Sequence, residues 1–230
     1  MTGKNFVMHI IDIHAHAIFK ETLNSIKGLG PEIGGDKDNP WFRVGDYKLE
    51  GVRYENTPFM DINLRLEAME SLGIDYQVLS PNPITYFHFI EPKEAINYCK
   101  LHNDTMAHSI SNHRERLGGF ASLPMQDPEA ASKELERSVK DLGFHGAYIG
   151  TDFPLGLAHK QMDDFYRSCI ELDVPLFLHP APQGINGPYS DNRLDLYSLD
   201  LTVGFANDET AALGNLIFGG VLHRHPDLDI

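Results

Sequence analysis

Short apolar runs alternate with longer amphipathic stretches along this 230-residue chain, and this alternation constrains the fold more than any other feature. The runs cover 6–13, 76–80, 119–123, 147–150 and 175–179. Continuous apolar runs of this length are typical of parallel strands that are buried on both faces. Strands that alternate with helices predict an α/β fold with a parallel sheet.

The stretches between the runs carry start signals for helices. Asp61 and Asp127 are suited to cap helices, because a carboxylate accepts hydrogen bonds from the free N–H groups of the first turn. Pro128 follows Asp127 at the first helical position, where proline is tolerated. Apolar residues at helical spacing predict further helices around 162–172 and over 208–222.

Two architectures contain such an alternation, a doubly wound sheet and a (β/α)8 barrel. No glycine-rich turn follows the first run, which disfavours the doubly wound sheet. Histidines stand at strand ends, where a barrel has its active site. We therefore predict a TIM-like (β/α)8 barrel of which only the first five βα units are present. The sequence is expected to be a fragment, and its two open sheet edges would make it prone to aggregate alone.

Two connections are longer than usual, which favours binding or lid roles. They span 17–60 and 180–206. Within the first, 41–44 and 47–56 flank Gly45-Asp46, which predicts a small β-hairpin over the barrel mouth. The chain 1–230 is then a single partial barrel domain with an insertion at about 17–60.

The formal net charge is −14, with 19 Lys and Arg against 33 Asp and Glu. This balance opposes binding to nucleic acid and to anionic membranes. A small anionic substrate remains compatible, because a metal ion or an arginine reverses the field locally. No run approaches the ~18 apolar residues of a membrane-spanning helix, and the N-terminus is too polar for a secretory signal. We expect a cytoplasmic protein.

Cys99 and Cys169 are the only cysteines, and their spacing matches no metal or redox motif. Two reduced thiols buried in helices are favoured over a single disulfide, since two distant cysteines form no disulfide framework.

His14 and His16 are two residues apart at the end of the first run. Side chains alternate along a strand, so both imidazoles are expected on one face together with Asp12. The opposite face, against the helices, is expected to hold Ile11, Ile13 and Ala15. Two imidazoles at this spacing can bind one divalent ion. A solvated or buried pair without metal is the alternative, and the position before a long loop favours the metal.

His179 is the last residue of the fifth run, after the apolar residues 176–178. Alone it is as compatible with a hydrogen-bonded structural histidine as with a ligand. Together with His14 and His16 it completes a three-histidine set of the kind that binds zinc. Neutral imidazole is the ligand form, so acid is expected to release the metal.

Arg43 and Arg53 lie in the predicted hairpin. An arginine there can hold a substrate carboxylate through two parallel hydrogen bonds. A surface side chain is the alternative for both and is favoured for Arg43. The other histidines, including His88 and His102, are interpreted as structural or exposed. The chain has no nucleophile elbow and no P-loop.

Several segments together resemble the amidohydrolase-related family that includes 2-amino-3-carboxymuconate-6-semialdehyde decarboxylase. They are 12–16 (DIHAH), 52–56 (VRYEN), 122–126 (SLPMQ), 142–151, 178–180 and 218–221. The resemblance covers nearly the whole chain, and DIHAH and SLPMQ are its most specific parts. It implies a barrel of the metal-dependent hydrolase type.

The resemblance also implies roles for individual residues. His14, His16 and His179 correspond to metal ligands, and Arg53 to the arginine that binds a substrate carboxylate. The family's acid/base histidine and a further aspartate ligand would lie beyond Ile230, so no catalytic acid/base is identified within the chain. Relatives in this family suggest a homodimer.

The implied function is that of a metal-dependent decarboxylase, a carboxy-lyase acting on a small unsaturated or aromatic carboxylate. The cofactor would be a divalent metal, with zinc favoured. A metal-dependent hydrolase of the same superfamily is the alternative, because the same ligands serve both reactions. An inactive fragment with only a binding or structural role is a third interpretation.

Overall fold

Six short parallel strands form the centre of the computed structural model, which describes residues 9–187, 189 and 191–230. One sheet has the order β1-β5-β6 and the other has the order β7-β8-β9. The strands are β1 Ile11–Ala17, β5 Tyr76–Pro81, β6 Leu117–Gly119, β7 Ala121–Ser122, β8 Ala147–Ile149 and β9 Leu176–Leu178. All neighbouring pairs are parallel, which confirms the predicted α/β class.

The chain passes from the first sheet to the second at Phe120. The N–H of Phe120 donates to the carbonyl of Leu79, and the N–H of Ala121 donates to the carbonyl of Gly146, both at 2.8 Å. Successive residues therefore bond to strands on opposite sides, and the two sheets form one row. Within the described residues this row is open, with β1 and β9 outermost. Closure into an eight-stranded barrel and the number of βα units remain predictions.

The first strand differs in extent from its prediction over 6–13. β1 covers Ile11–Ala17, so His14 and His16 lie within the strand rather than at its end. The strand continues because Ala15 and Ala17 reach the hydrophobic core, where they are 8% and 2% exposed. Residues 6–8 of the predicted strand lie outside the described residues.

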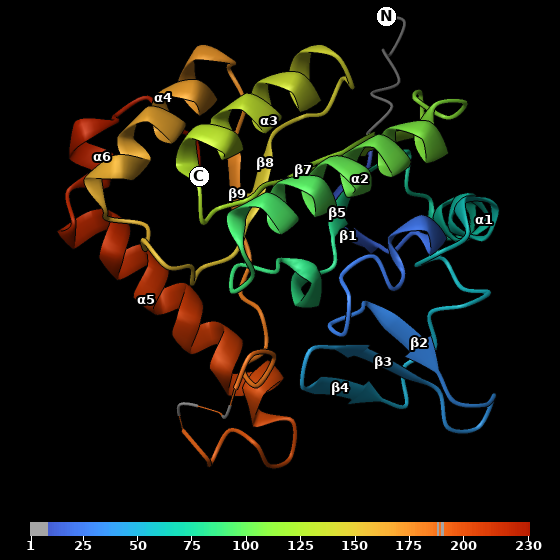
Figure 1. Cartoon of the computed structure of the whole chain (residues 1–230). Coiled ribbons are helices and arrows are strands. Elements are labelled where there is room, and N and C mark those ends of the chain that lie inside the picture. Colours follow the sequence, from blue (N-terminus) through green and yellow to red (C-terminus); the bar gives the residue numbers. More distant parts are fainter. Residues whose placement is uncertain (1–8, 188, 190) are drawn as a thin grey trace, which may run out of the picture.

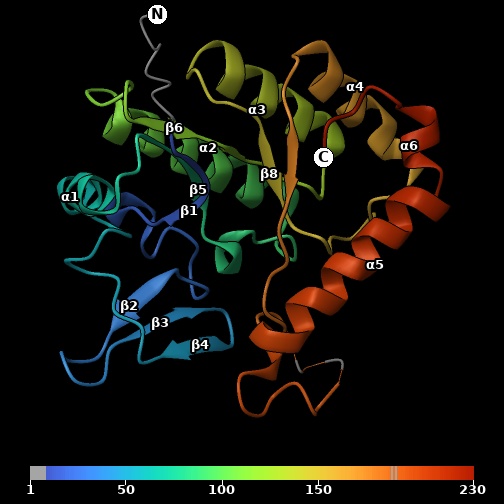
Figure 2. The ribbon, with the colours of Figure 1, turned by 180° about the vertical axis from the view of Figure 1, so that it is seen from behind.

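Four helices cover one side of the strands, as Figures 1 and 2 show from opposite directions. They are α1 Ile62–Leu72, α2 Pro92–Ile110, α3 Pro128–Lys140 and α4 Asp163–Glu171. The predicted caps are confirmed: Asp61 accepts the N–H groups of Asn63 and Leu64, and Asp127 accepts that of Ala130. Short helical turns occur at η1 Lys20–Thr22, η2 Pro83–Thr85 and η3 Lys160–Met162.

The last predicted helix, over 208–222, begins and ends earlier in the structure. A π-helical turn, η4 Asp200–Gly204, leads into α5 Phe205–Phe218, and α6 Val221–Arg224 follows. The break between α5 and α6 occurs at Gly220, whose φ of +71° lies in the left-handed region that favours glycine. A continuous helix through 222 was therefore the wrong expectation.

An antiparallel sheet occupies much of the long connection after β1. It has the order β2-β3-β4, with β2 Glu32–Gly34, β3 Trp41–Val44 and β4 Tyr47–Glu50. The predicted hairpin around Gly45-Asp46 is confirmed. Its second strand ends at Glu50 rather than at 56, because Gly51 turns the backbone with a φ of +76°. The strand β2 was not predicted.

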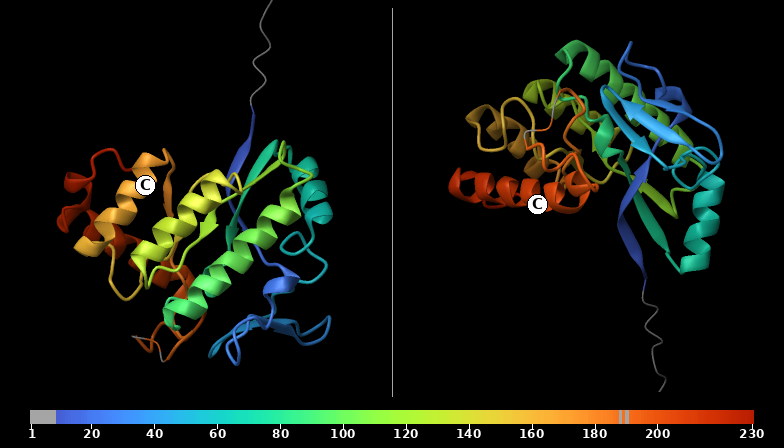
Figure 3. Two further views of the ribbon diagram at one scale, coloured as in Figure 1. Left: turned by 45° about the horizontal axis from the view of Figure 1, so that its top comes forward. Right: turned by 90° about the horizontal axis from the view of Figure 1, so that it is seen from below.

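The two long connections pack against each other. The N–H of Asp46 donates to the carbonyl of Ile185 at 3.0 Å, and the hydroxyl of Tyr47 donates to Asp200 at 3.1 Å. A Cβ on Gly45 would lie 2.2 Å from the Ile185 carbonyl oxygen, so this approach requires glycine. Figure 3 shows the small sheet and the second connection at one end of the molecule.

Both cysteines are free and buried, Cys99 in α2 and Cys169 in α4, as predicted. Burial raises the pKa of each thiol to about 12. None of the helices in the described residues has the length and apolar character needed to cross a membrane.

Candidate metal site

The structure brings together the three histidines that the sequence singled out. His14 and His16 extend from β1, and His179 directly follows β9. The ring centroids lie 5.0 Å apart for His14 and His16, 4.9 Å for His14 and His179, and 5.0 Å for His16 and His179. One nitrogen from each ring lies within 4.8 Å of the others. At this separation, small side-chain rotations suffice for one divalent ion to contact all three nitrogens.

The hydrogen bonds of two of these imidazoles leave the same nitrogen free. Nδ1 of His16 lies 3.2 Å from the carbonyl of Pro81, and Nδ1 of His179 lies 2.6 Å from the carbonyl of Pro180. A carbonyl oxygen only accepts, so each Nδ1 carries the proton and each Nε2 keeps its lone pair. Ser80 also contacts Nδ1 of His16, at 3.0 Å. This tautomer presents Nε2 as the metal-binding atom.

The charge state of the same imidazoles fits a metal ligand. The pKa of His16 is lowered to about 3, chiefly by burial and further by His179 and His14. The pKa of His179 is lowered to about 4, again chiefly by burial. Both rings are therefore neutral at neutral pH, which is the form that binds a metal ion.

A bulge in β1 corrects the predicted position of Asp12. Asp12 pairs with Gln77 and Ala15 with Leu79, so three steps along β1 match two along β5. Such an extra residue interrupts the alternation of side chains. The Asp12 carboxylate accepts from Nε2 of Gln77 at 2.7 Å, and Gln77 in turn accepts from Arg65 of α1. Asp12 therefore faces α1 and not the histidine cluster.

The predicted packing of Ile11 and Ile13 against the helices is also wrong. Their side chains are 58% and 51% exposed, and of the three residues assigned to that face only Ala15 is buried. The bulge accounts for this difference, because Asp12 takes the side that faces α1 and the alternation that would have placed Ile11 and Ile13 with Ala15 is interrupted.

The two arginines of the insertion differ in environment. Arg43 pairs with Glu32 across β2 and β3 at 2.6 Å and donates to the carbonyl of Gly45, which supports a structural role. Arg53 is exposed, and its Nε donates to the carbonyl of Glu55 at 3.1 Å within the same loop. Its role in substrate binding stays a prediction.

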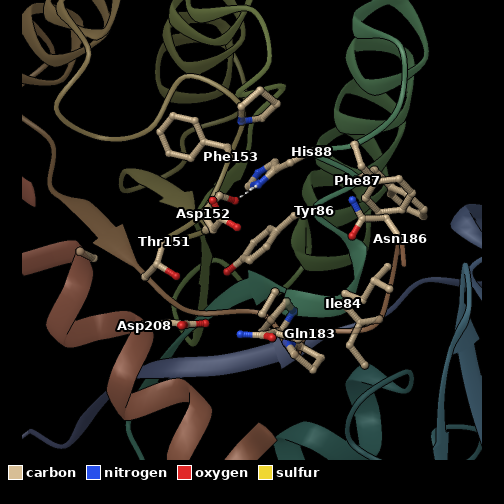
Figure 4. Close-up of a pocket in the computed structure, with 18 of the residues that line it drawn as sticks. Ile84, Tyr86, Phe87, His88, Thr151, Asp152, Phe153, Gln183, Asn186 and Asp208 are labelled. Atoms are coloured by element: carbon tan, nitrogen blue, oxygen red, sulfur yellow. Dashed lines mark hydrogen bonds between the residues drawn. The ribbon is translucent and has the colours of Figure 1, made fainter. Parts of the chain in front are cut away.

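Figure 4 shows a cavity of about 660 Å³, and contacts of its lining residues place it beside the histidine cluster. Its walls come from the segments that follow β5, β8 and β9 and from α5. Ala181 and Pro182, close behind His179, belong to it, and the hydroxyl of Tyr86 in its wall donates to the carbonyl of His179 at 3.1 Å. Its lining residues include four aromatic rings besides a histidine, but neither lysine nor arginine.

His88 lines this cavity, although the sequence assigned it a structural or exposed role. Its ring stacks on Tyr86 with centroids 5.1 Å apart, and its Nδ1 donates to the carbonyl of Asp152 at 2.9 Å. Burial lowers the pKa of His88 to about 4, so the ring is neutral at neutral pH. The sequence signal that was missed is the position of His88 shortly after the second predicted strand. Position at a strand end was the criterion that identified His179.

Comparison with known proteins places the chain in a family. Residues 11–230 match the family model described as amidohydrolase, and the chain belongs to that family. It is 30% identical over 227 residues to 2-amino-3-carboxymuconate-6-semialdehyde decarboxylase of Dictyostelium discoideum, covering 96% of this chain and 61% of that protein. It is 32% identical over 204 residues to gamma-resorcylate decarboxylase of Rhizobium radiobacter, covering 84% and 60%.

Solved structures give the same relationship. A 2,6-dihydroxybenzoate decarboxylase from Rhizobium superposes with a TM-score of 0.75 at 26% identity, covering 96% of this chain and 65% of that one. A dihydroxybenzoic acid decarboxylase from Polaromonas, with bound manganese and the inhibitor 2-nitroresorcinol, superposes with a TM-score of 0.74 at 27% identity, covering 96% and 63%. The chain thus spans about three fifths of the length of these relatives.

Proposed function

We propose that this chain carries the metal centre of a metal-dependent decarboxylase acting on a small aromatic or unsaturated carboxylate. One observation supports this most directly: three imidazoles, two of them with Nε2 left free, converge beside an aromatic-lined cavity. The related decarboxylases, one of which holds manganese, support the reaction class.

The proposed ligands are His14, His16 and His179. Three imidazoles favour zinc, and the manganese in the Polaromonas relative makes Mn²⁺ the second candidate. When bound, the ion would supply Lewis-acid chemistry to oxygen atoms of the substrate. Burial keeps His16 and His179 neutral for this role.

The remaining parts of the site would orient the substrate. The cavity offers aromatic walls, including Tyr86 and Phe153, that suit a planar ring. No lysine or arginine occurs among its described lining residues, so the carboxylate would be held by the ion or by Arg53. Such fixation reduces the entropy that must be lost before the carbon–carbon bond breaks. We assign no acid/base residue among the described residues.

The test is CO₂ release by the full-length protein loaded with Zn²⁺ or Mn²⁺ and supplied with 2,6-dihydroxybenzoate and related aromatic carboxylates. Metal content is measured in parallel for the wild type and for His14→Ala/His16→Ala, with His108→Ala on the exposed face of α2 as control. We expect stoichiometric metal and CO₂ release that the double variant abolishes. Equal metal content in both proteins refutes the site.

Two other results would select the alternative functions. Ester or lactone hydrolysis without CO₂ release indicates a hydrolase. Bound metal without either reaction indicates a binding role. Light scattering on the same samples tests the homodimer that the family resemblance suggests.

A further inference from the structure

A buried polar chain lies behind the bulge of β1, on the side opposite the histidine cluster. Arg65 of α1 is 5% exposed, and its Nη1 donates to Oε1 of Gln77 at 2.7 Å. Gln77 of β5 is 7% exposed, and its Nε2 donates to Oδ2 of Asp12 at 2.7 Å. Three elements are thus joined by hydrogen bonds that water reaches poorly.

Both ends of this chain bind the backbone of a candidate metal ligand. Oδ1 of Asp12 accepts the N–H of His14 at 3.0 Å. Nη2 of Arg65 donates to the carbonyl of His16 at 2.7 Å. A bulge disrupts the backbone ladder at this point. Side chains therefore satisfy backbone groups of both histidines at the bulge.

We propose that Asp12, Gln77 and Arg65 are positioning residues that hold the β1 bulge so that His14 and His16 face one metal ion. The inference rests on the proposed metal centre. Without the bulge, strict alternation would place Asp12 on the same face as the two histidines. With it, the carboxylate turns toward α1 while both imidazoles remain on the other side.

The cost of burying Arg65 agrees with this role. Burial lowers the pKa of its guanidinium to about 10, with Asp12 partly opposing the effect, and its Nε has no hydrogen-bond partner among the described residues. An apolar side chain between helix and strand would be less costly to bury. The guanidinium contributes contacts to Gln77 and to the His16 carbonyl that an apolar side chain cannot make.

The hydrogen bonds in this chain have a fixed direction. Arg65 only donates, so Gln77 must turn its oxygen toward Arg65 and its amide nitrogen toward Asp12. Asp12 must accept on both oxygens, from Gln77 and from His14. A carboxylate is therefore required at position 12 as long as an amide occupies position 77.

This direction suggests an isosteric test. Asp12→Asn sets an amide NH₂ against either Gln77 or the His14 N–H, whichever way it is turned. Gln77→Glu sets two carboxylates against each other. The double variant Asp12→Asn/Gln77→Glu pairs every donor with an acceptor again and restores the original net charge. Glu67→Gln on the exposed face of α1 controls for the loss of one negative charge.

The readouts are Co²⁺ affinity by chelator competition and the visible spectrum of bound Co²⁺, which reports ligand number and geometry. We expect each single variant to lose about 10- to 100-fold in affinity and to change the spectrum, in the range found when groups that orient metal ligands are removed. The double variant should return to within about threefold of the wild type. Glu67→Gln should match the wild type.

Each outcome decides between the alternatives. If the wild type gives no Co²⁺ spectrum, the proposed metal centre fails and this inference fails with it. If the wild type binds Co²⁺ and Asp12→Asn leaves affinity and spectrum unchanged, only the positioning role is overturned. If the single variants do not fold by circular dichroism, the double variant decides: wild-type affinity supports the role, and persistently weak binding in a folded protein refutes it.

Discussion

The two strands that carry the histidine cluster hold their imidazoles in different ways. β1 is an outermost strand with exposed isoleucines and a bulge, and side chains of Asp12 and Arg65 bind its backbone. At the end of β9, His179 is 7% exposed, and its N–H donates to the carbonyl of Ile149 at 3.0 Å. Its ring donates to a neighbouring backbone carbonyl.

The site thus has a β1 half, with His14 and His16, and a β9 half, with His179. The two halves are expected to tolerate different substitutions. The N–H and the ring of His179 bind backbone carbonyls, and the Tyr86 hydroxyl that donates to its carbonyl is the one side chain among the described residues that bonds to its backbone. The β1 half depends on donors and acceptors that must point in one direction. Substitutions of nearly equal size are therefore expected to disturb β1 more than β9.

Removal of a ligand from either strand is the change with the largest expected effect. His16→Ala and His179→Ala should each weaken zinc binding by roughly 10²- to 10³-fold, because one of about four ligands contributes about a quarter of the 10–16 kcal/mol of a structural zinc site. Chelator competition measures this, with His108→Ala as control. A large effect from only one of the two variants would mean that the strands do not share one ion.

The parts of this arrangement that follow from local patterns were predictable. Apolar runs identified the strands, and Asp61 and Asp127 identified helix starts, because capping depends on neighbouring residues alone. The histidine cluster was predictable because parallel strands bring their carboxyl ends to one edge.

The bulge was not predictable, because it depends on the register between β1 and β5. The sequence of 11–17 alone does not show that β1 has one residue more than the segment of β5 with which it pairs. Asp12 was consequently assigned to the wrong face, and the polar chain through Gln77 and Arg65 was missed. The cavity around His88 was missed for a related reason, since it is assembled from segments far apart in the sequence.

Acid is expected to protonate the buried imidazoles on both halves of the site. A buried histidine outside the cluster separates the effect of burial on stability from the effect of metal binding. His102 of α2 is 1% exposed, and burial lowers its pKa to about 4. The unfolded chain takes up this proton near pH 6.5, so below that pH the unfolded state binds more protons than the folded one. The contribution of His102 to the free energy of unfolding should therefore be undiminished above pH 6.5 and fall by about 3 kcal/mol between pH 6.5 and 4, in addition to the losses from the buried His16, His88 and His179.

Urea unfolding of the metal-free protein across this range measures the effect. His102→Leu should reduce the fall in stability by about 3 kcal/mol, and His108→Gln, on the exposed face of the same helix, should leave the fall unchanged. An unaltered slope in His102→Leu would show that burial of His102 does not contribute to the acid sensitivity.

The smallest expected changes in metal affinity concern two hydroxyl groups, and they test the difference between β1 and β9. Ser80→Ala removes a contact to Nδ1 of His16 and leaves the Pro81 carbonyl as its acceptor, so metal affinity should fall about 10-fold or somewhat less. Tyr86→Phe removes a donor to the His179 carbonyl but leaves the ring's own bond to Pro180, so affinity should change by less than about threefold. Both are measured by zinc competition, with Ser111→Ala at the end of α2 as control. A larger loss from Tyr86→Phe than from Ser80→Ala would show that the β9 half also depends on a side chain, and the distinction between the two strands would no longer hold.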